Sequence, residues 1–377
     1  MHDPRLEKLA AVVVGYSLAV KTGDSVVIKG PPIAEPLILA LVERVLRAGG
    51  HPIVRCVPEA VEELICRHGK GKQLTHHAPA DKLEIETVDC LIAIWASSNT
   101  RALSGVNPKQ QQARSRGRKP FLDTFMKRIS AAGRKRLRWV GTQFPCQASA
   151  QDADMSLRDY ADFVFRGGLL HLPNPQMAWR KIRTRQQRVV DHLDRAREVR
   201  FVTRNGTDLR VGVAGRKWIN CCGANNFPDG EVFTGPIEDA TEGQVCYTFP
   251  AVHGGREVTD VVLRFKNGRV VDAAASKNEE FLFKMLDQDK GARLLGEIAI
   301  GTNYAIRQFT RNTLFDEKIG GTFHAAVGAA YPESGGKNKS ALHWDMVCDL
   351  RRGGTIEVDG KVISRNGKFT RKTWPQP

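Results

Sequence analysis

The stretch DSVVIKGPPIAEPLILALVERVLRAGGHPIVRCV, residues 24–57, contains the signals of a strand, a helix and a second strand in close succession. Asp24–Lys29 is rich in β-branched residues and predicts the first strand. Residues 34–48 predict a helix, because Pro36 stands in its first turn and apolar residues recur on one face. Gly49-Gly50 ends this helix, and the apolar run after it predicts the second strand. This alternation is typical of an open α/β sheet.

The same alternation continues through the first half of the chain. Two further apolar runs, residues 88–96 and 138–143, predict strands with helical or loop segments between them. Gly30-Pro31-Pro32 occupies the turn after the first strand, so no GxGxxG motif and no dinucleotide-binding signature is found there. We therefore expect an N-terminal α/β domain over residues 1–195, ending in a basic helical connection within residues 160–197.

The second half of the chain has a different pattern of turn signals, because every Asn-Gly dipeptide lies there. Runs of β-branched residues flank these dipeptides and Asp359-Gly360, which predicts β-hairpins. Helices are expected at residues 278–286 and 289–295. The predicted fold class is α/β, with an N-terminal open α/β sheet domain followed by a β-rich α+β metal-binding catalytic domain over residues 196–377. The Asn-Gly dipeptides are Asn205-Gly206, Asn267-Gly268 and Asn366-Gly367.

The composition is that of a globular protein, with 41% hydrophobic and 26% charged residues among 377. No run approaches the ~18 apolar residues of a membrane span, and the start of the chain lacks the features of a secretory signal, so we expect a cytoplasmic location and no membrane partner. The net charge of +16 suggests nucleic-acid binding. The basic clusters at residues 114–119 and 134–138 lack interleaved aromatic residues and any recognition motif, so we expect no specific nucleic-acid partner.

Residues of the metal-ligand type gather in the last third of the chain. His343 and Asp345 are separated by one residue, so an extended backbone points both to the same face. Imidazole and carboxylate ligands without a pair of cysteines at ligand spacing favour an open, catalytic site for zinc, cobalt, manganese or iron. Two divalent cations carry four positive charges, and Glu231, Glu297 and Asp345 would reduce these to about one. The set therefore permits a dinuclear hydrolase.

Five segments resemble, in order and content, the signatures of the thermophilic aminopeptidase family, also called aminopeptidase T. The resemblance is strongest over roughly residues 200–370 and covers the N-terminal half only in its strand–helix rhythm and in residues 21–28. The five segments are FPDGEVFTGP (227–236), GEIAIGTN (296–303), LFDEKIGGTFH (314–324), AYP (330–332) and SALHWDMV (340–347).

The resemblance implies a homodimeric exopeptidase that removes N-terminal residues from peptides with a free N-terminus. It also implies two divalent metal ions per subunit, zinc, cobalt or manganese, with Glu297 as the plausible bridge between them. It assigns Glu317 and Tyr331 as catalytic residues, Glu317 to carry a proton and Tyr331 to stabilise an oxyanion. The implied metal ligands are Glu231, Glu297, His324, His343 and Asp345.

Several residues also have a simpler interpretation. Glu317 can form a salt bridge with the adjacent Lys318 or with a distant arginine, and Tyr331 beside a proline can be a packing residue. Cys221 and Cys222 are interpreted as core thiols. His253 stands where the family is expected to have tyrosine, which indicates a residue at a strand end or pocket wall and concerns specificity rather than metal binding.

Two other reactions on the same scaffold stay open from sequence. His324, His343 and Asp345 alone would form the two-histidine, one-carboxylate triad of a mononuclear iron ring-cleaving dioxygenase. Glu231 and Glu297 argue against that interpretation, because such a centre does not need the extra acids. The second of these reactions is the hydrolytic removal of an amino group from an aromatic ring. It would use more of these acidic residues, and the sequence does not distinguish it from peptide hydrolysis.

Overall fold

The computed structural model describes residues 3–377. The expectation that the chain starts without a secretory signal also concerns Met1 and His2, which lie outside the described residues. The chain divides into two compact units. The first holds the residues up to Gln176 together with Gly223–Phe227, and the second holds Met177–Cys222 and Pro228–Pro377. Compared with the expected boundary at residue 195, the division falls near the start of α10 (Pro175–Leu193) rather than after its end. Among residues 3–377, no helix combines the length and the apolar character that a membrane span requires.

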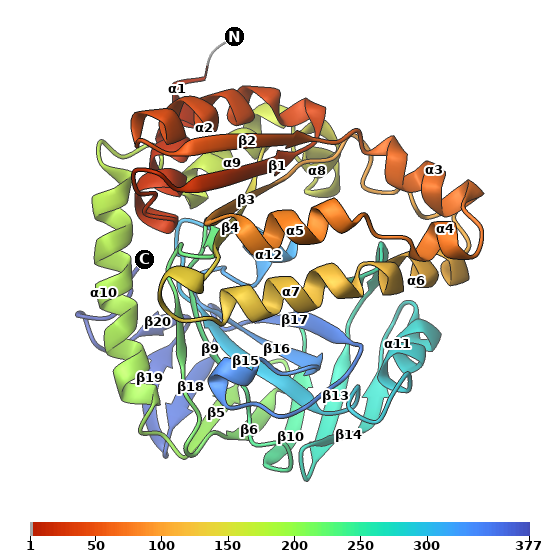
Figure 1. Ribbon diagram of the computed structural model, residues 1–377. Helices are drawn as coiled ribbons and strands as arrows, with labels where there is room; N and C mark the ends of the chain where they lie inside the picture. The colour runs from red at the N-terminus through yellow and green to blue at the C-terminus, as the bar shows by residue number, and fades with distance from the viewer. Residues whose placement is uncertain (1–2) are drawn as a thin grey trace. The chain divides into compact units, whose positions relative to one another are not determined.

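A parallel sheet with strand order β2-β1-β3-β4-β8 forms the centre of the first unit (Figure 1). The four predicted strands are all present in it, and β8 is a short addition that follows in sequence only after the long α10 helix. The strands are β1 (Ser25–Gly30), β2 (His51–Cys56), β3 (Cys90–Trp95), β4 (Arg138–Gln143) and β8 (Asn226–Phe227).

Helices cover both faces of this parallel sheet, as expected for an open α/β fold. On one face Ile38 of α2 packs near Gly30 and Ile94, and on the other the aromatic residues of α7 pack with Val27 and Leu91. The helices of this unit are α1 (Pro4–Val12), α2 (Glu35–Arg47), α3 (Ala60–His68), α4 (Lys72–Thr75), α5 (Pro79–Thr87), α6 (Pro108–Gly117), α7 (Lys119–Ile129), α8 (Gln147–Asp152) and α9 (Leu157–Gly167).

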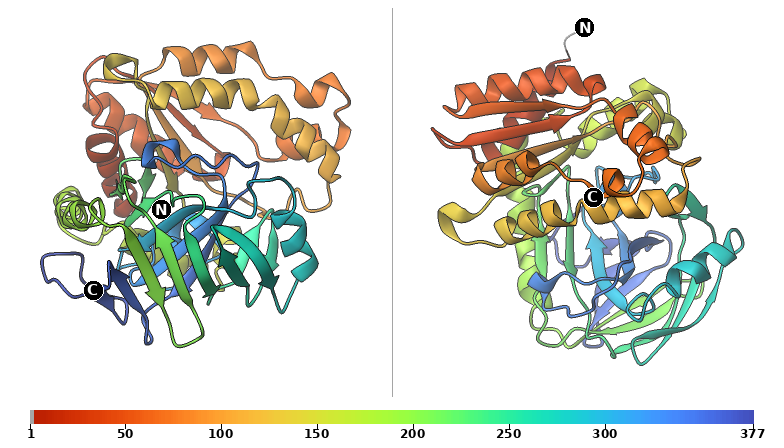
Figure 2. Two further views of the ribbon diagram at one scale, coloured as in Figure 1. Left: turned by 90° about the horizontal axis from the view of Figure 1, so that it is seen from below. Right: turned by 45° about the vertical axis from the view of Figure 1, so that its right-hand side comes forward.

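The second unit contains two antiparallel sheets, which confirms the predicted β-rich half (Figure 2). The eight-stranded sheet has the order β14-β13-β10-β6-β5-β18-β19-β20, and the five-stranded sheet has the order β17-β16-β15-β9-β7. The strands of the eight-stranded sheet are β5 (Glu198–Val202), β6 (Asp208–Gly212), β10 (Thr241–Cys246), β13 (Val262–Lys266), β14 (Arg269–Ala274), β18 (Thr355–Val358), β19 (Lys361–Arg365) and β20 (Lys368–Phe369). Those of the five-stranded sheet are β7 (Ile219–Cys221), β9 (Glu231–Thr234), β15 (Leu295–Gly301), β16 (Thr322–Gly328) and β17 (His343–Asp349). The remaining elements are the hairpin β11 (Ala251–His253) and β12 (Arg256–Val258), with α11 (Glu279–Leu286) and α12 (Thr313–Asp316).

The main core of this unit lies between the two antiparallel sheets. Apolar side chains of both sheets belong to one buried cluster, in which Phe201 of β5 stacks on Phe323 of β16 with ring centroids 4.2 Å apart. Burial of this apolar surface is the dominant favourable contribution to folding of the unit. Side chains alternate along a strand. In the five-stranded sheet, the sequence neighbours of each residue that faces this core therefore lie on the opposite face of the sheet.

The hairpin signals identified the turns correctly, but one predicted helix was wrong. Asn267, Asp359 and Asn366 have positive φ and are each followed by a glycine with positive φ, as a type I′ turn requires. Residues 289–295 form a turn instead of a helix, because the Asp289 carboxylate accepts hydrogen bonds from the backbone N–H groups of Gly291 and Ala292. The chain then pairs with the start of β14 and enters β15.

A β-bulge at Gly296 decides which way Glu297 points. The register of β15 against β16 shifts between Leu295 and Glu297, so that Gly296 is the extra residue. Leu295 therefore faces the core, and Glu297, two residues later, faces the opposite side of the sheet. A bulge of this kind re-aims a side chain that strict alternation would have placed with Leu295.

Replacing Gly296 with alanine should destabilise the protein, because the new Cβ would lie 2.3 Å from the carbonyl oxygens of Gly328 and Ala329. We expect the free energy of unfolding to fall by about 1–3 kcal/mol, the usual cost of overpacking. Urea unfolding measures this change. Gly105→Ala is the matched control, since its Cβ would meet only Arg67 Nη2, at 3.5 Å. Equal unfolding midpoints for the two variants would contradict the role of the bulge.

Candidate metal centre

The five predicted ligands lie on one face of the five-stranded sheet. Four adjacent strands supply them: β9 carries Glu231, β15 carries Glu297, β16 carries His324, and β17 carries His343 and Asp345. Trp344, between the last two, belongs to the core cluster on the other face. The predicted extended geometry of the His343–Asp345 pair is therefore present.

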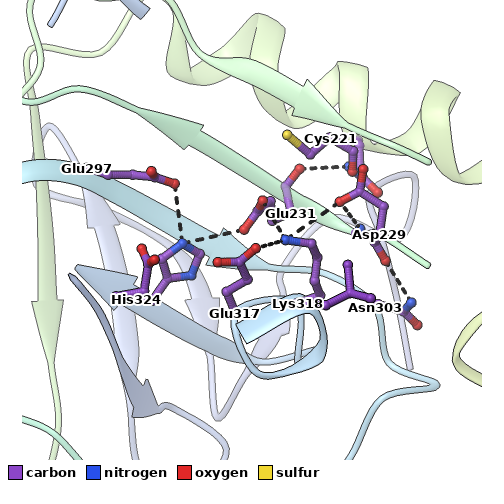
Figure 3. Close-up of polar contacts among 12 residues, drawn as sticks. Cys221, Asp229, Glu231, Glu297, Asn303, Glu317, Lys318 and His324 are labelled. Carbon is purple, nitrogen blue, oxygen red and sulfur yellow. Dashed lines mark hydrogen bonds and ion pairs between the residues drawn. The ribbon is translucent and has the colours of Figure 1, made fainter. Parts of the chain in front are cut away.

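The side chains of Glu231, Glu297 and His324 approach one another closely (Figure 3). His324 Nε2 lies 3.3 Å from Glu297 Oε1 and 3.4 Å from Glu231 Oε2. His343 Nε2 lies 3.5 Å from Glu297 Oε2 and 3.4 Å from Asp345 Oδ1. Glu297 thus directs one carboxylate oxygen toward each imidazole.

Glu317 and Tyr331 border this group. Glu317 directly follows α12, and one of its carboxylate oxygens lies within 4.8 Å of ligand atoms of His324 and Asp345. The Tyr331 ring meets the His343 ring edge-on with centroids 5.2 Å apart. Tyr331 as a whole is 41% exposed, yet desolvation of its hydroxyl and the charges of Glu297 and Asp345 raise the pKa of Tyr331 above its ordinary value. Its phenol therefore keeps its proton.

The burial of Lys318 was not predicted from the sequence. Its side chain is fully buried, and its Nζ lies 2.9 Å from Glu231 Oε1, in contact with Glu317 Oε1 and 3.9 Å from Asp229 Oδ1. Only the adjacency of Lys318 to Glu317 pointed to an ion pair. Cys221, interpreted as a core thiol, also has its sulfur within 4.8 Å of carboxylate oxygens of Asp229 and Glu231. Burial and these two acids raise the pKa of the Cys221 thiol well above its ordinary value.

Charge coupling governs protonation in this centre. Burial raises the pKa of Glu231, Glu297 and Glu317 above the usual carboxyl range. Burial opposes the charged form of His324, but Glu297 and Glu231 outweigh it and raise its pKa to about 9. Burial likewise opposes charged His343, yet the neighbouring carboxylates, Asp345 first among them, raise its pKa to about 10. The cluster therefore attracts positive charge, which is the electrostatic requirement of a cation site.

The residues present fit a divalent metal ion. Glu231 Oε2 and Asp345 Oδ1 are buried and have no hydrogen-bond partner among residues 3–377, although imidazole nitrogens lie near both. His343 Nδ1 lies 2.8 Å from the carbonyl oxygen of Ala329. In the tautomer that donates this hydrogen bond, Nε2 is a free ligand atom, as is usual for metal-binding histidines. Mixed nitrogen and oxygen donors suit zinc, cobalt and manganese.

A small hollow adjoins the centre at Glu317 and Asp345. Apolar side chains form much of its wall, and Phe309 in this wall stacks on Phe249 with ring centroids 5.0 Å apart. The lining residues are Pro250, Val252, Phe309, Arg311, Thr313, Asp316, Glu317, Asp345 and Val347. His253 ends β11, as predicted, and its ring lies 5.4 Å from that of Trp344.

An antiparallel sheet that carries a buried group of carboxylates and imidazoles beside a hollow indicates a metal-dependent enzyme. The chain belongs to the thermophilic metalloprotease (M29) family, which it matches over residues 2–369. Membership confirms the resemblance seen in the sequence and makes the protein a metal-dependent hydrolase that acts on peptide bonds.

Curated relatives support the assignment along nearly the whole chain. Aminopeptidase 2 of Geobacillus stearothermophilus is 28% identical and covers 97% of this chain and 98% of its own length. Aminopeptidase AmpS of Bacillus subtilis (strain 168) is 30% identical over 72% of this chain and 75% of its own. Aminopeptidase T of Thermus thermophilus is 28% identical over 94% of each chain.

Two solved structures share the fold. Wild-type AmpT from Thermus thermophilus superimposes with a TM-score of 0.84 and 26% identity, over 98% of this chain and 99% of that one. This match confirms the predicted fold class. A 2,5-dihydroxypyridine dioxygenase from Pseudomonas putida KT2440 has a TM-score of 0.63 and 16% identity over 98% of each chain, which shows a common fold alone.

Removal of divalent cations should lower the thermal stability of the protein, because the buried carboxylates lose their counter-charge. A metal at about 100 times its dissociation constant stabilises the folded state by about 2.7 kcal/mol. Thermal unfolding after chelation, and again after addition of zinc, cobalt or manganese, measures the shift. Asp345→Asn should show a smaller shift, since it removes a predicted ligand charge. An unchanged midpoint in the unsubstituted protein would contradict a metal centre here.

Proposed function

We propose that this protein is a metal-dependent aminopeptidase that removes N-terminal residues from peptides at a centre holding two divalent cations. The observation that carries the proposal is the position of Glu297. Ligand atoms of Glu297, Glu231 and His324 lie within 4.8 Å of one another, and so do those of Glu297, His343 and Asp345. Two sets of three ligands that share one carboxylate are what a bridged pair of cations requires.

The charges agree with two divalent ions. Glu231, Glu297 and Asp345 balance three of their four positive charges, and Lys318 is matched by Glu317 and Asp229. When bound, such cations acidify a water molecule and polarise the carbonyl group of the scissile bond. A centre built from both sets would leave each ion with three protein ligands and an open position.

The remaining steps belong to residues of the chain. Glu317 would accept a proton on its carboxylate from the attacking water and pass it to the nitrogen of the leaving amine. The Tyr331 phenol would donate a hydrogen bond to the oxygen on which negative charge develops. The free α-ammonium group of the peptide would pair with a carboxylate of the centre, which restricts cleavage to the N-terminal residue.

Peptide hydrolysis accounts for these contacts better than a mononuclear oxygenase does. An iron triad needs His324, His343 and one carboxylate, whereas here Glu297 lies between the two imidazoles and Glu231 adds a further oxygen. The likeness to the dioxygenase concerns the fold alone. The relatives with the higher identities carry aminopeptidase names.

Metal-depleted protein, reloaded separately with zinc, cobalt, manganese and ferrous iron, tests this function. We expect cleavage of aminoacyl amides such as leucine amide with zinc, cobalt or manganese, no cleavage of the N-acetylated amides, and no oxygen uptake. Hydroxylated and amino-substituted aromatic compounds are assayed in parallel, with oxygen and released ammonia recorded. Activity confined to iron with oxygen consumption, or ammonia release from the aromatic amines alone, would refute the proposal.

The number of ions is a separate prediction. We expect about two divalent ions per chain in the unsubstituted protein and fewer than one in Glu297→Gln, because that change weakens both sets of ligands. Elemental analysis after dialysis against buffered metal measures the ratio. Glu280→Gln is the matched control, since the Glu280 side chain is 85% exposed and pairs only with Lys284 among the described ion pairs. A single ion in the unsubstituted protein would exclude the dinuclear centre, and two ions in Glu297→Gln would exclude Glu297 as the shared ligand.

A further inference from the structure

Lys318 is an unusual residue for the interior of a protein, because its ammonium group is completely buried. Transfer of an ammonium group from water to an apolar interior is unfavourable unless opposite charges and hydrogen bonds replace the water. Three carboxylates surround Nζ here: Glu231, Glu317 and Asp229 (Figure 3). Lys318 is therefore enclosed by one proposed ligand, Glu231, and by two further acids.

The backbone around Lys318 is tied to the strand that carries Glu231. The N–H of Asn303 donates to the carbonyl oxygen of Lys318 at 3.1 Å, and its side-chain amide donates to the carbonyl oxygen of Asp229 at 2.8 Å. Gly230 has a φ of 127°, and a Cβ there would lie 2.6 Å from the Cβ of Asn303. Asn303 thus joins the two segments whose acidic residues meet the ammonium group.

Lys318 Nζ donates hydrogen bonds to one oxygen of Glu231 and to one oxygen of Glu317. Glu231 accepts a hydrogen bond from Lys318 on Oε1, and its Oε2 faces His324. Glu317 also accepts a hydrogen bond from Lys318 on Oε1. One of the Glu317 carboxylate oxygens nevertheless lies within 4.8 Å of ligand atoms of His324 and Asp345. At that distance, a freely rotating Glu317 could join the metal ligands, and a carboxylate bound to metal is a poor proton carrier.

We propose that Lys318 is a positioning residue that holds Glu317 out of the set of metal ligands. This inference rests on the proposed function, in which Glu317 moves the proton. Lys318 acts only through these carboxylates, because its buried ammonium group has no access to substrate.

Lys318→Met tests the inference. Without the ammonium group, Glu317 is expected to bind the metal ions, so kcat should fall by about 100-fold or more, the usual contribution of a positioned acid or base. KM should stay within about threefold, and two divalent ions should remain bound, since the proposed ligands are unchanged. Lys284→Met is the matched control at an exposed ion pair and should keep the original kcat. An unchanged kcat in Lys318→Met would overturn the inference.

A double-mutant cycle with Glu317→Gln separates positioning from packing. If Lys318 acts through Glu317, adding Lys318→Met to Glu317→Gln should change kcat by no more than about threefold. An equal fall in kcat on both backgrounds would overturn the inference. If Lys318→Met alone does not fold, the cycle is measured in the Asp229→Asn background, which removes one of the three facing charges.

The failure of this inference differs from the failure of the proposed function. If the unsubstituted protein binds no divalent cation or cleaves no aminoacyl amide, the proposed function is wrong. If it does both, and Lys318→Met lowers bound metal and kcat in proportion on either background, then Lys318 supports the structure of the centre without positioning Glu317. Elemental analysis and steady-state kinetics on the same samples distinguish these results.

Discussion

The two-residue alternation of side chains in the five-stranded sheet is the constraint on which the rest of the second unit depends. It sends Ile298, Phe323 and Trp344 into the core and their sequence neighbours to the opposite face. The bulge at Gly296 brings Glu297 into the same pattern. Four neighbouring strands can thereby present acids and imidazoles together, on a sheet whose other face is held in place by the core.

The second constraint is electrostatic. Buried carboxylates repel one another and are poorly solvated, so the fold must supply opposite charge. Lys318 supplies part of it within the chain, and the raised pKa values of His324 and His343 show that the imidazoles also take up positive charge in the protein without metal. Divalent cations can replace those protons. We therefore expect metal binding and folding of this unit to be linked.

The common scaffold does not determine the reaction. A dioxygenase with 16% identity has the same fold over 98% of this chain, while the AmpT structure matches more closely in both sequence and shape. What distinguishes the possible chemistries is the number of carboxylates within reach of the imidazoles and the presence of a proton carrier beside them. In this chain, carboxylate oxygens of Glu231, Glu297 and Glu317 each lie within 4.8 Å of a nitrogen of His324.

The sequence alone determined the strand–helix alternation of the first half, the hairpins at Asn267-Gly268, Asp359-Gly360 and Asn366-Gly367, and the identity of the five candidate ligands, because these signals are local or occur in recognisable segments. Only the tertiary structure decided that residues 289–295 form a turn, that Gly296 is a bulge, and that Lys318 is fully buried among acids. The physical reason is that burial and charge compensation depend on residues far apart in the chain. From sequence, a lysine beside a glutamate is interpreted as a surface ion pair. The fold places Asp229 and Glu231, nearly ninety residues away in sequence, next to Lys318.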